Sequence, residues 1–349
     1  MVPVTRDLRL PPQGGLPPTD SRGGSVVEIA CDESGFSGTN LLDPATPVFT
    51  HASVDLRVDE AAELIRTLQS GVPWSLDELK AGRFLRRPQA DEAVESLLAA
   101  VSGRAHVHVV DKEYFLVTRI VDLFLAEPSY AAGTRLTGQQ RPAALSLYRA
   151  ACAAGREWDV FLEALVDLVR TKKGRRTDRR VVQRFFAARD SLARLGLGPE
   201  AEAVLDRISR TRVRAILTRL ARDDRSIPPP LEPLLPALAE TVLFWSRGGQ
   251  RQVQVVHDEQ SALTAGRLRR LQEALANGAQ PSAADAPGAG TSPATVSPLA
   301  GLVTVDSRDD PRIQVADLLA AVARRSRKDG DGRLLQPFIS PTSLWDPQR

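Results

Sequence analysis

Short apolar segments rich in β-branched residues occur only toward the two ends of this chain, and none lies between Lys112 and Arg251. Such segments, bounded by polar or turn residues, are typical of strands. They cover residues 25–31, 47–56, 105–110, 252–257 and 302–305. Helical patterns separate them, at residues 59–69, 89–102, 259–277 and 311–325. Strands that alternate with helices predict an α/β fold with a layered core.

The stretch between the two groups of strands carries only helical patterns, at residues 112–126, 141–154, 157–170, 178–195, 199–222 and 231–246. This order predicts a core in two parts, 25–111 and 252–326, interrupted by a large all-helical insertion at 112–251. Residues 1–24 and 278–300 are rich in proline, glycine and small polar residues, which predicts a disordered leader and a flexible loop. Residues 327–349 are expected to form a C-terminal tail.

Composition excludes several classes of protein. With 42% hydrophobic and 26% charged residues, the chain can bury a core, which excludes disordered and collagen-like chains. No apolar run approaches the roughly 18 residues that span a bilayer, so we expect no membrane partner. Only two cysteines occur, Cys31 and Cys152, which excludes a disulfide framework and favours the reducing cytoplasm.

Three of the strand-like segments are followed directly by an aspartate, namely Asp32, Asp111 and Asp258. Open α/β sheets bind their ligands at the carboxyl ends of strands, although a single aspartate there more often begins a turn. Three aspartates in this position favour a shared acidic site. Because like charges gather only around a cation, the pattern predicts Mg²⁺ or Mn²⁺, which prefer oxygen ligands.

Asp317 is the most unusual acid, because it lies in an apolar helical pattern at 313–322. Its neighbours at i−4, i+3 and i+4 are Ile313, Ala320 and Ala321, so we expect no polar face around it. A carboxylate in such a place is costly unless it is paired or bound to a metal. We expect metal binding, and a salt bridge to Arg324 or Arg325 is the alternative.

Three further residues have weaker patterns. Glu78 stands close to Lys80, which is typical of a solvated surface pair. Lysine occurs at only five positions in the chain, so Lys80 and Lys112 stand out. Either lysine could orient a carboxylate or contact a phosphate, and the alternative for each is a solvated surface position.

Four short motifs follow one another along the chain: Cys31-Asp-Glu-Ser-Gly35, Glu78-Leu-Lys80, Val110-Asp-Lys112 and Ile313-Gln-Val-Ala-Asp-Leu-Leu319. In these motifs the chain resembles the bacterial DESG-type family called domain of unknown function 3800, which is grouped with ribonuclease H-like folds. The resemblance implies a ribonuclease H-like mixed sheet flanked by helices. It also implies that Asp32, Glu78 and Asp317 are metal ligands, with Asp258 or Asp111 as a further acid.

The histidines are weaker candidates. His257 precedes Asp258 and points to the other side of its strand, while His106 and His108 share a face opposite Asp111. No cysteine or histidine spacing typical of zinc is present. We therefore expect ordinary polar strand positions at these histidines.

Arginines are dense in the helical stretch, in a basic run at 170–180 and in the series Arg207, Arg210 and Arg214 at helical spacing. A solvated helix face is the alternative. Since the candidate acids lie in the core, a basic insertion beside them could hold the phosphate backbone of nucleic acid without sequence preference.

Together these features predict a cytoplasmic, divalent-metal-dependent phosphodiesterase, in particular a nuclease acting on DNA or RNA by a two-metal mechanism. The nuclease activity is inferred from the superfamily by analogy. The alternative is a non-catalytic module that binds nucleic acid or protein on the same fold.

Overall fold

A computed structural model describes residues 15–17, 25–36, 38, 40–70, 80–86, 90–170, 178–278, 296–329 and 333–346. The chain divides into two compact units. The first unit comprises Met1–Asp32, Ala52–Ala105 and Val242–Leu319. The second comprises Glu33–His51, His106–Thr241 and Ala320–Arg349.

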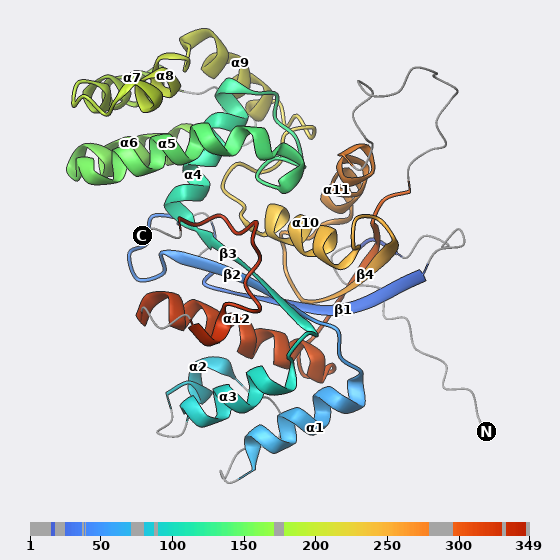
Figure 1. Ribbon diagram of the computed structural model, residues 1–349. Coiled ribbons are helices and arrows are strands. Elements are labelled where there is room, and N and C mark those ends of the chain that lie inside the picture. Colours follow the sequence, from blue (N-terminus) through green and yellow to red (C-terminus); the bar gives the residue numbers. More distant parts are fainter. Residues whose placement is uncertain are drawn as a thin grey trace. The chain divides into compact units, whose positions relative to one another are not determined.

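The strands form one five-stranded mixed sheet in the order β3-β2-β1-β4-β5 (Figure 1). They are β1 (Ser25–Ser34), β2 (Val48–Val54), β3 (Ala105–Asp111), β4 (Arg251–Asp258) and β5 (Leu299–Val305). Strands β1, β4 and β5 are parallel, with Val27 opposite Val253 and Val255 opposite Leu302. The predicted α/β class, a mixed sheet flanked by helices, is confirmed.

Helices of the first unit are short and amphipathic. They are α1 (Val58–Gln69), α2 (Ala81–Phe84), α3 (Ala90–Ala100), α11 (Ala265–Gly278) and the first half of α12 (Pro311–Asp329). Helix α1 packs against α3 (Figure 1). Helix α11 packs against β5. The Glu60 side chain accepts the Arg57 N–H at 2.7 Å and so caps α1, which buries Ala61, Ile65 and Leu68 at helical spacing.

The second unit is mainly helical. Its helices, including α10 that crosses the boundary between the units, are α4 (Lys112–Ile120), η1 (Val121–Leu125), η2 (Arg135–Gln140), α5 (Arg141–Ala151), η3 (Cys152–Ala154), α6 (Arg156–Val169), α7 (Arg179–Ala193), α8 (Pro199–Asp206), α9 (Arg210–Ala221), α10 (Leu234–Trp245) and η4 (Arg333–Leu335). Helix α6 packs against α7, and α5 against α8 (Figure 1). As expected, the described residues between β3 and β4 include no strand. No helix of the described chain is long and apolar enough to cross a membrane.

Two helix boundaries differ from the predictions. The continuous helix expected at 199–222 is two helices, because Ser209 has an extended backbone and its Oγ accepts the Arg212 N–H at 3.1 Å, which starts a new helix there. Arg207 therefore ends α8 and does not continue the helical spacing of Arg210 and Arg214. Helix α11 begins at Ala265 instead of residue 259, since turns occupy the preceding residues.

Parts of the expected leader, loop and tail have regular structure. Leu16 pairs with Leu302 through two backbone hydrogen bonds, and β5 begins at Leu299, inside the expected loop. In the C-terminal segment, Ile339 and Leu344 pair in parallel with β3. These residues cover the backbone of a strand that would otherwise be an open sheet edge.

Candidate functional site

Asp32 and Asp258 become neighbours through the parallel pairing of β1 with β4. The register sets Cys31 opposite His257, so the next residue on each strand is an aspartate and both point to the same face of the sheet. Adjacent strands lie about 4.8 Å apart. Asp32 is buried and Asp258 is half-buried. Two carboxylates in this arrangement disfavour each other's charge unless a cation or a proton compensates it.

The sequence predicted that Asp32 follows the end of its strand. In the structure β1 continues to Ser34, so Asp32 lies within the strand. Ser34 Oγ accepts a hydrogen bond from Arg324 Nε at 3.0 Å. Gly35 has a φ of +84°, and a Cβ atom there would lie 2.3 Å from the Val48 carbonyl oxygen. The last two residues of the Cys31–Gly35 motif therefore have structural roles.

The Asp258 carboxylate also orders the loop that follows β5. Its Oδ1 accepts the Ser307 N–H at 3.2 Å, and the Ser307 carbonyl accepts from Gln314 Nε2 at 2.9 Å. Hydrogen bonds from Arg308 hold the pKa of Asp306 well below its usual range, and the charge of Lys80 lowers this pKa further. The exposed Lys80 thus adds positive charge to this part of the first unit.

Asp317 lies on α12 within residues 312–323, and all side chains of this stretch except that of Asp317 are buried. Asp317 itself is half-buried, so its carboxylate reaches the surface more than the apolar pattern predicted. Its Oδ2 accepts the Ala81 N–H at 3.4 Å, at the beginning of α2. Of the two arginines considered as salt-bridge partners, Arg324 instead donates to Ser34.

An ion-pair network that the sequence analysis missed fixes the beginning of α12. The buried Arg312 donates through Nη1 to Glu28 Oε1 at 2.7 Å and through Nη2 to Asp310 Oδ2 at 2.6 Å. Burial opposes the charge of Arg312, but these bonds outweigh burial and raise its pKa. The sequence did contain one indication of this network, because Glu28 is a charged residue within an apolar strand pattern. The network ties α12, and hence Asp317, to β1.

Asp111 and Lys112 belong to the second unit, where both have structural contacts. Asp111 caps α4: its Oδ1 accepts the Tyr114 N–H at 2.9 Å and its Oδ2 accepts the Tyr148 hydroxyl at 2.8 Å. Lys112 is 1% exposed, and its Nζ donates to Thr46 Oγ1 at 3.2 Å. Burial lowers the pKa of Lys112 to about 8. The solvated alternative is therefore wrong for Lys112, and capping accounts for Asp111.

The three histidines considered as polar strand positions are all buried in the sheet. Burial lowers the pKa of His106 and of His108 to about 3 and that of His257 to about 4. His257 Nδ1 contacts the Asp258 carbonyl oxygen at 3.0 Å, whereas the His108 ring nitrogens have no hydrogen-bond partner among the described residues. These rings are neutral core side chains.

Because these histidines are buried and neutral, we expect the free energy of unfolding to fall in mild acid. A His108 pKa of about 3 in the folded chain, against 6.5 when unfolded, means that the unfolded state takes up the proton first as the pH falls. Between pH 7 and pH 5 this costs about 2 kcal/mol. Urea unfolding at both pH values should therefore show a smaller loss for His108→Leu than for wild type, and parallel losses would contradict this origin.

Among the described residues, no three aspartate, glutamate, histidine or cysteine side chains gather closely enough to hold a metal ion by themselves. Glu78 lies outside the described residues. Magnesium is commonly held by one or two carboxylates together with water and substrate phosphates. The adjacent Asp32 and Asp258 meet that need, so the donor set fits a hard divalent cation.

Comparison of the chain with protein-family models, with curated proteins and with solved structures finds no match. The family resemblance therefore stays a prediction that rests on its motifs. In the first unit, Asp32 of β1 and Asp258 of β4 are adjacent, the half-buried Asp317 lies on α12, and the exposed Lys80 precedes α2. Two adjacent carboxylates can bind a divalent cation.

Proposed function

We propose that this chain is a divalent-metal-dependent phosphodiesterase that hydrolyses nucleic acid beside Asp32 of β1 and Asp258 of β4. The observation that carries the proposal is the register that makes Asp32 and Asp258 neighbours on one face of the sheet. Two carboxylates side by side on one face of a sheet favour the binding of a cation between them. The four sequence motifs and the exposed Lys80 support the same reading.

Asp32 and Asp258 would hold Mg²⁺ or Mn²⁺. The family resemblance implies Asp317 and Glu78 as further ligands, but among the described residues Asp317 does not form a cluster with these two aspartates. A bound divalent ion activates water and stabilises the charge that develops on phosphate oxygens, and two such ions clamp both sides of the reaction. In the folded chain, Asp258 is oriented by the Ser307 N–H. Lys80, close enough to Asp306 to lower its pKa, would contact a substrate phosphate.

We further propose that the sheet is a ribonuclease H-like core and that the helices between β3 and β4 are an insertion that binds nucleic acid. The mixed five-stranded sheet with parallel β1, β4 and β5 is compatible with such a core. The support for an insertion is that no strand occurs among the described residues between Lys112 and Gln250.

The nucleic-acid contact would be made by the exposed arginines Arg207, Arg210 and Arg214. In the described part of the chain none of them forms an ion pair, whereas Arg212 and Arg219 of α9 pair with Glu127. Like charges four residues apart, as in Arg210 and Arg214, destabilise a helix. A phosphate backbone would neutralise them.

Replacing Arg207, Arg210 and Arg214 by glutamine should weaken duplex binding and flatten its salt dependence. Each phosphate contact contributes about 0.9 to the slope of log K against log salt, so the slope should change by roughly 2 to 3. Fluorescence anisotropy in EDTA measures this without cleavage. A control with Arg225, Arg269 and Arg333 replaced removes equal charge from other exposed positions. An equal effect of both triple variants would contradict a specific surface.

The activity itself is tested on labelled single- and double-stranded DNA and RNA in Mg²⁺, in Mn²⁺ and in EDTA. We expect the wild type to cleave at least one of these substrates in a divalent cation and none of them in EDTA. The Asp32→Asn variant should cleave none of them under any condition. Binding without cleavage on every substrate and metal would favour the non-catalytic binding module and reject the hydrolase.

A further inference from the structure

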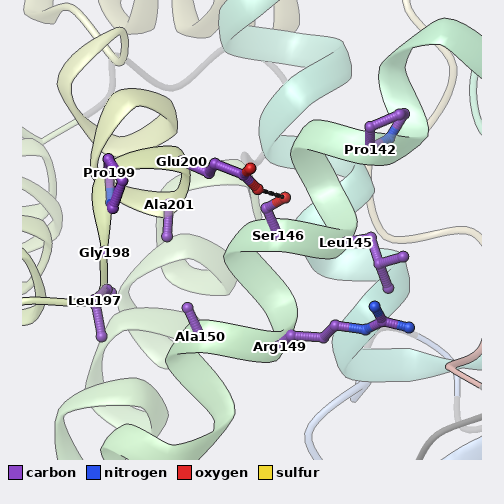
Figure 2. Close-up of a pocket in the computed structure, with 10 residues that line it drawn as sticks. All are labelled: Pro142, Leu145, Ser146, Arg149, Ala150, Leu197, Gly198, Pro199, Glu200 and Ala201. Carbon is purple, nitrogen blue, oxygen red and sulfur yellow. Dashed lines mark hydrogen bonds between the residues drawn. The ribbon is translucent and has the colours of Figure 1, made fainter.

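A groove of about 620 Å³ lies between α5 and the beginning of α8 in the second unit (Figure 2). Its polar side chains are already bonded within the chain, since Ser146 Oγ donates to Glu200 Oε2 at 2.8 Å and Arg149 pairs with Asp346. The other residues that line it are apolar or glycine, so the groove indicates no particular ligand chemistry. Polar contacts in the first unit are more informative, because they lead to the acidic pair.

The first of these contacts is made by Gln314, near the beginning of α12. Its side chain is only 8% exposed, and its neighbours Ile313 and Val315 are fully buried. The Gln314 Nε2 donates to the Ser307 carbonyl oxygen at 2.9 Å. The loss of such a bond is costly for a buried donor, so Gln314 fixes the position of the Ser307 carbonyl.

The peptide group that joins Ser307 to Arg308 is held at both ends. Gln314 donates to its carbonyl oxygen, and its N–H, which belongs to Arg308, donates to Asp306 Oδ1 at 2.9 Å. Because a peptide group is planar and rigid, a hydrogen bond at each end fixes its orientation. The orientation of the loop at Ser307 therefore depends on Gln314.

The peptide group before it, between Asp306 and Ser307, is held in the same way. Its carbonyl oxygen accepts the Asp309 N–H at 2.9 Å, and its N–H donates to Asp258 Oδ1 at 3.2 Å. Of these four hydrogen bonds, only the one to Asp258 leaves the segment 306–314. The loop thus presents the Ser307 N–H to the Asp258 carboxylate, and Gln314 holds the loop in that position.

The cation-binding role proposed for Asp258 depends on how its carboxylate is turned. Hydrogen bonds from surrounding residues orient the carboxylates that bind a metal, and losing such a bond typically weakens metal binding about 10- to 100-fold. We propose that Gln314 is a positioning residue for the metal site: through Ser307 it fixes the rotation of the Asp258 carboxylate beside Asp32. This inference rests on the proposed function, and Gln314 itself would not contact the cation.

The first unit contains a matched control in Gln272 of α11. Its Nε2 also donates to a backbone carbonyl oxygen at 2.9 Å, that of Leu299. Leu299 is opposite Val253 in the register of β4 with β5, whereas Asp258 is opposite Val305 at the other end of both strands. Replacing Gln272 therefore removes an equivalent hydrogen bond without changing the support of Asp258.

Gln314→Met and Gln272→Met are compared with wild type by a Mn²⁺ titration followed by electron paramagnetic resonance, without nucleic acid. Methionine has a similar length and no N–H donor. We expect Gln314→Met to raise the Kd for Mn²⁺ about 10-fold and Gln272→Met to bind like wild type. In EDTA, amide hydrogen exchange at residues 303–310 should become faster in Gln314→Met only, because the loop loses its hydrogen bond to α12.

Urea unfolding in EDTA confirms that each variant is folded. If Gln314→Met does not fold, Gln314→Asn, whose side chain is one methylene shorter, carries the test. Absence of Mn²⁺ binding by the wild type would reject the metal site and this inference with it. Binding that the Gln314 variant retains in full, or that both glutamine variants weaken equally, would overturn the positioning role alone. Weaker binding by the Gln314 variant without faster exchange at residues 303–310 would also overturn it, since Gln314 would then not act through Ser307.

Discussion

Asp258→Asn is expected to lower the rate of metal-dependent phosphodiester cleavage by about 10³-fold, the scale of losing one strong electrostatic contact to the transition state. Asparagine keeps the Oδ1 atom that accepts the Ser307 N–H at 3.2 Å, so the loop after β5 should keep its conformation. The variant then removes only the negative charge beside Asp32. Single-turnover cleavage in Mg²⁺ measures the loss, and thermal unfolding in EDTA confirms that the fold is intact.

Asp111→Asn is the matched control for that loss. Its carboxylate caps α4 and accepts the Tyr148 hydroxyl within the second unit, and asparagine is a good capping residue. We therefore expect cleavage within about 5-fold of wild type, since no contact to the transition state is removed. A large loss of cleavage in Asp111→Asn together with normal cleavage by Asp258→Asn would show that Asp111, and not Asp258, acts with Asp32. That result would contradict the site described above.

Arg312→Ala should lower the free energy of unfolding by about 3 to 5 kcal/mol, which is the usual cost of removing one partner of a buried ion pair. The Arg312 side chain is 10% exposed and its partner Asp310 is 9% exposed, so the remaining carboxylate would be left in a poorly solvated place. Glu28 would lose its partner as well. Denaturant unfolding in EDTA measures the change without any contribution from a bound metal.

The chain offers a matched control in Arg308, which bonds to Asp306 two residues earlier just as Arg312 bonds to Asp310. The Arg308 side chain is 64% exposed, and exposed pairs contribute at most about 1 kcal/mol. Arg308→Ala should therefore destabilise far less than Arg312→Ala. Equal losses would mean that burial does not decide the energy of these pairs.

Local patterns were sufficient for much of the fold. Short apolar segments rich in β-branched residues placed the strands of the sheet within a few residues, because strands such as β2 and β3 are buried along almost their whole length. The helix break at Ser209 was harder, since a capping serine inside an arginine-rich helical pattern competes weakly with helix continuation. Pairing of Ile339 and Leu344 with β3 depends on contacts distant in sequence, so it leaves no local pattern.

The candidate site shows the same division between local and distant information. Aspartates that end strands are visible in the sequence, but only the register between β1 and β4 sets Asp32 beside Asp258. The sequence left Asp111 and Asp258 as equal alternatives, because both follow strands. Capping of α4 by Asp111 depends partly on Tyr148, which lies 37 residues further along the chain. The burial of Lys112 likewise depends on tertiary packing and not on its neighbours in sequence.

The most direct test of the acidic pair as a metal site is a Mn²⁺ titration followed by electron paramagnetic resonance, without nucleic acid. The parallel register of β1 with β4 sets Asp32 and Asp258 side by side. We predict saturable Mn²⁺ binding by the wild type and its loss in the folded double variant Asp32→Asn/Asp258→Asn. Unchanged binding by the double variant, or no binding by the wild type, would contradict the account.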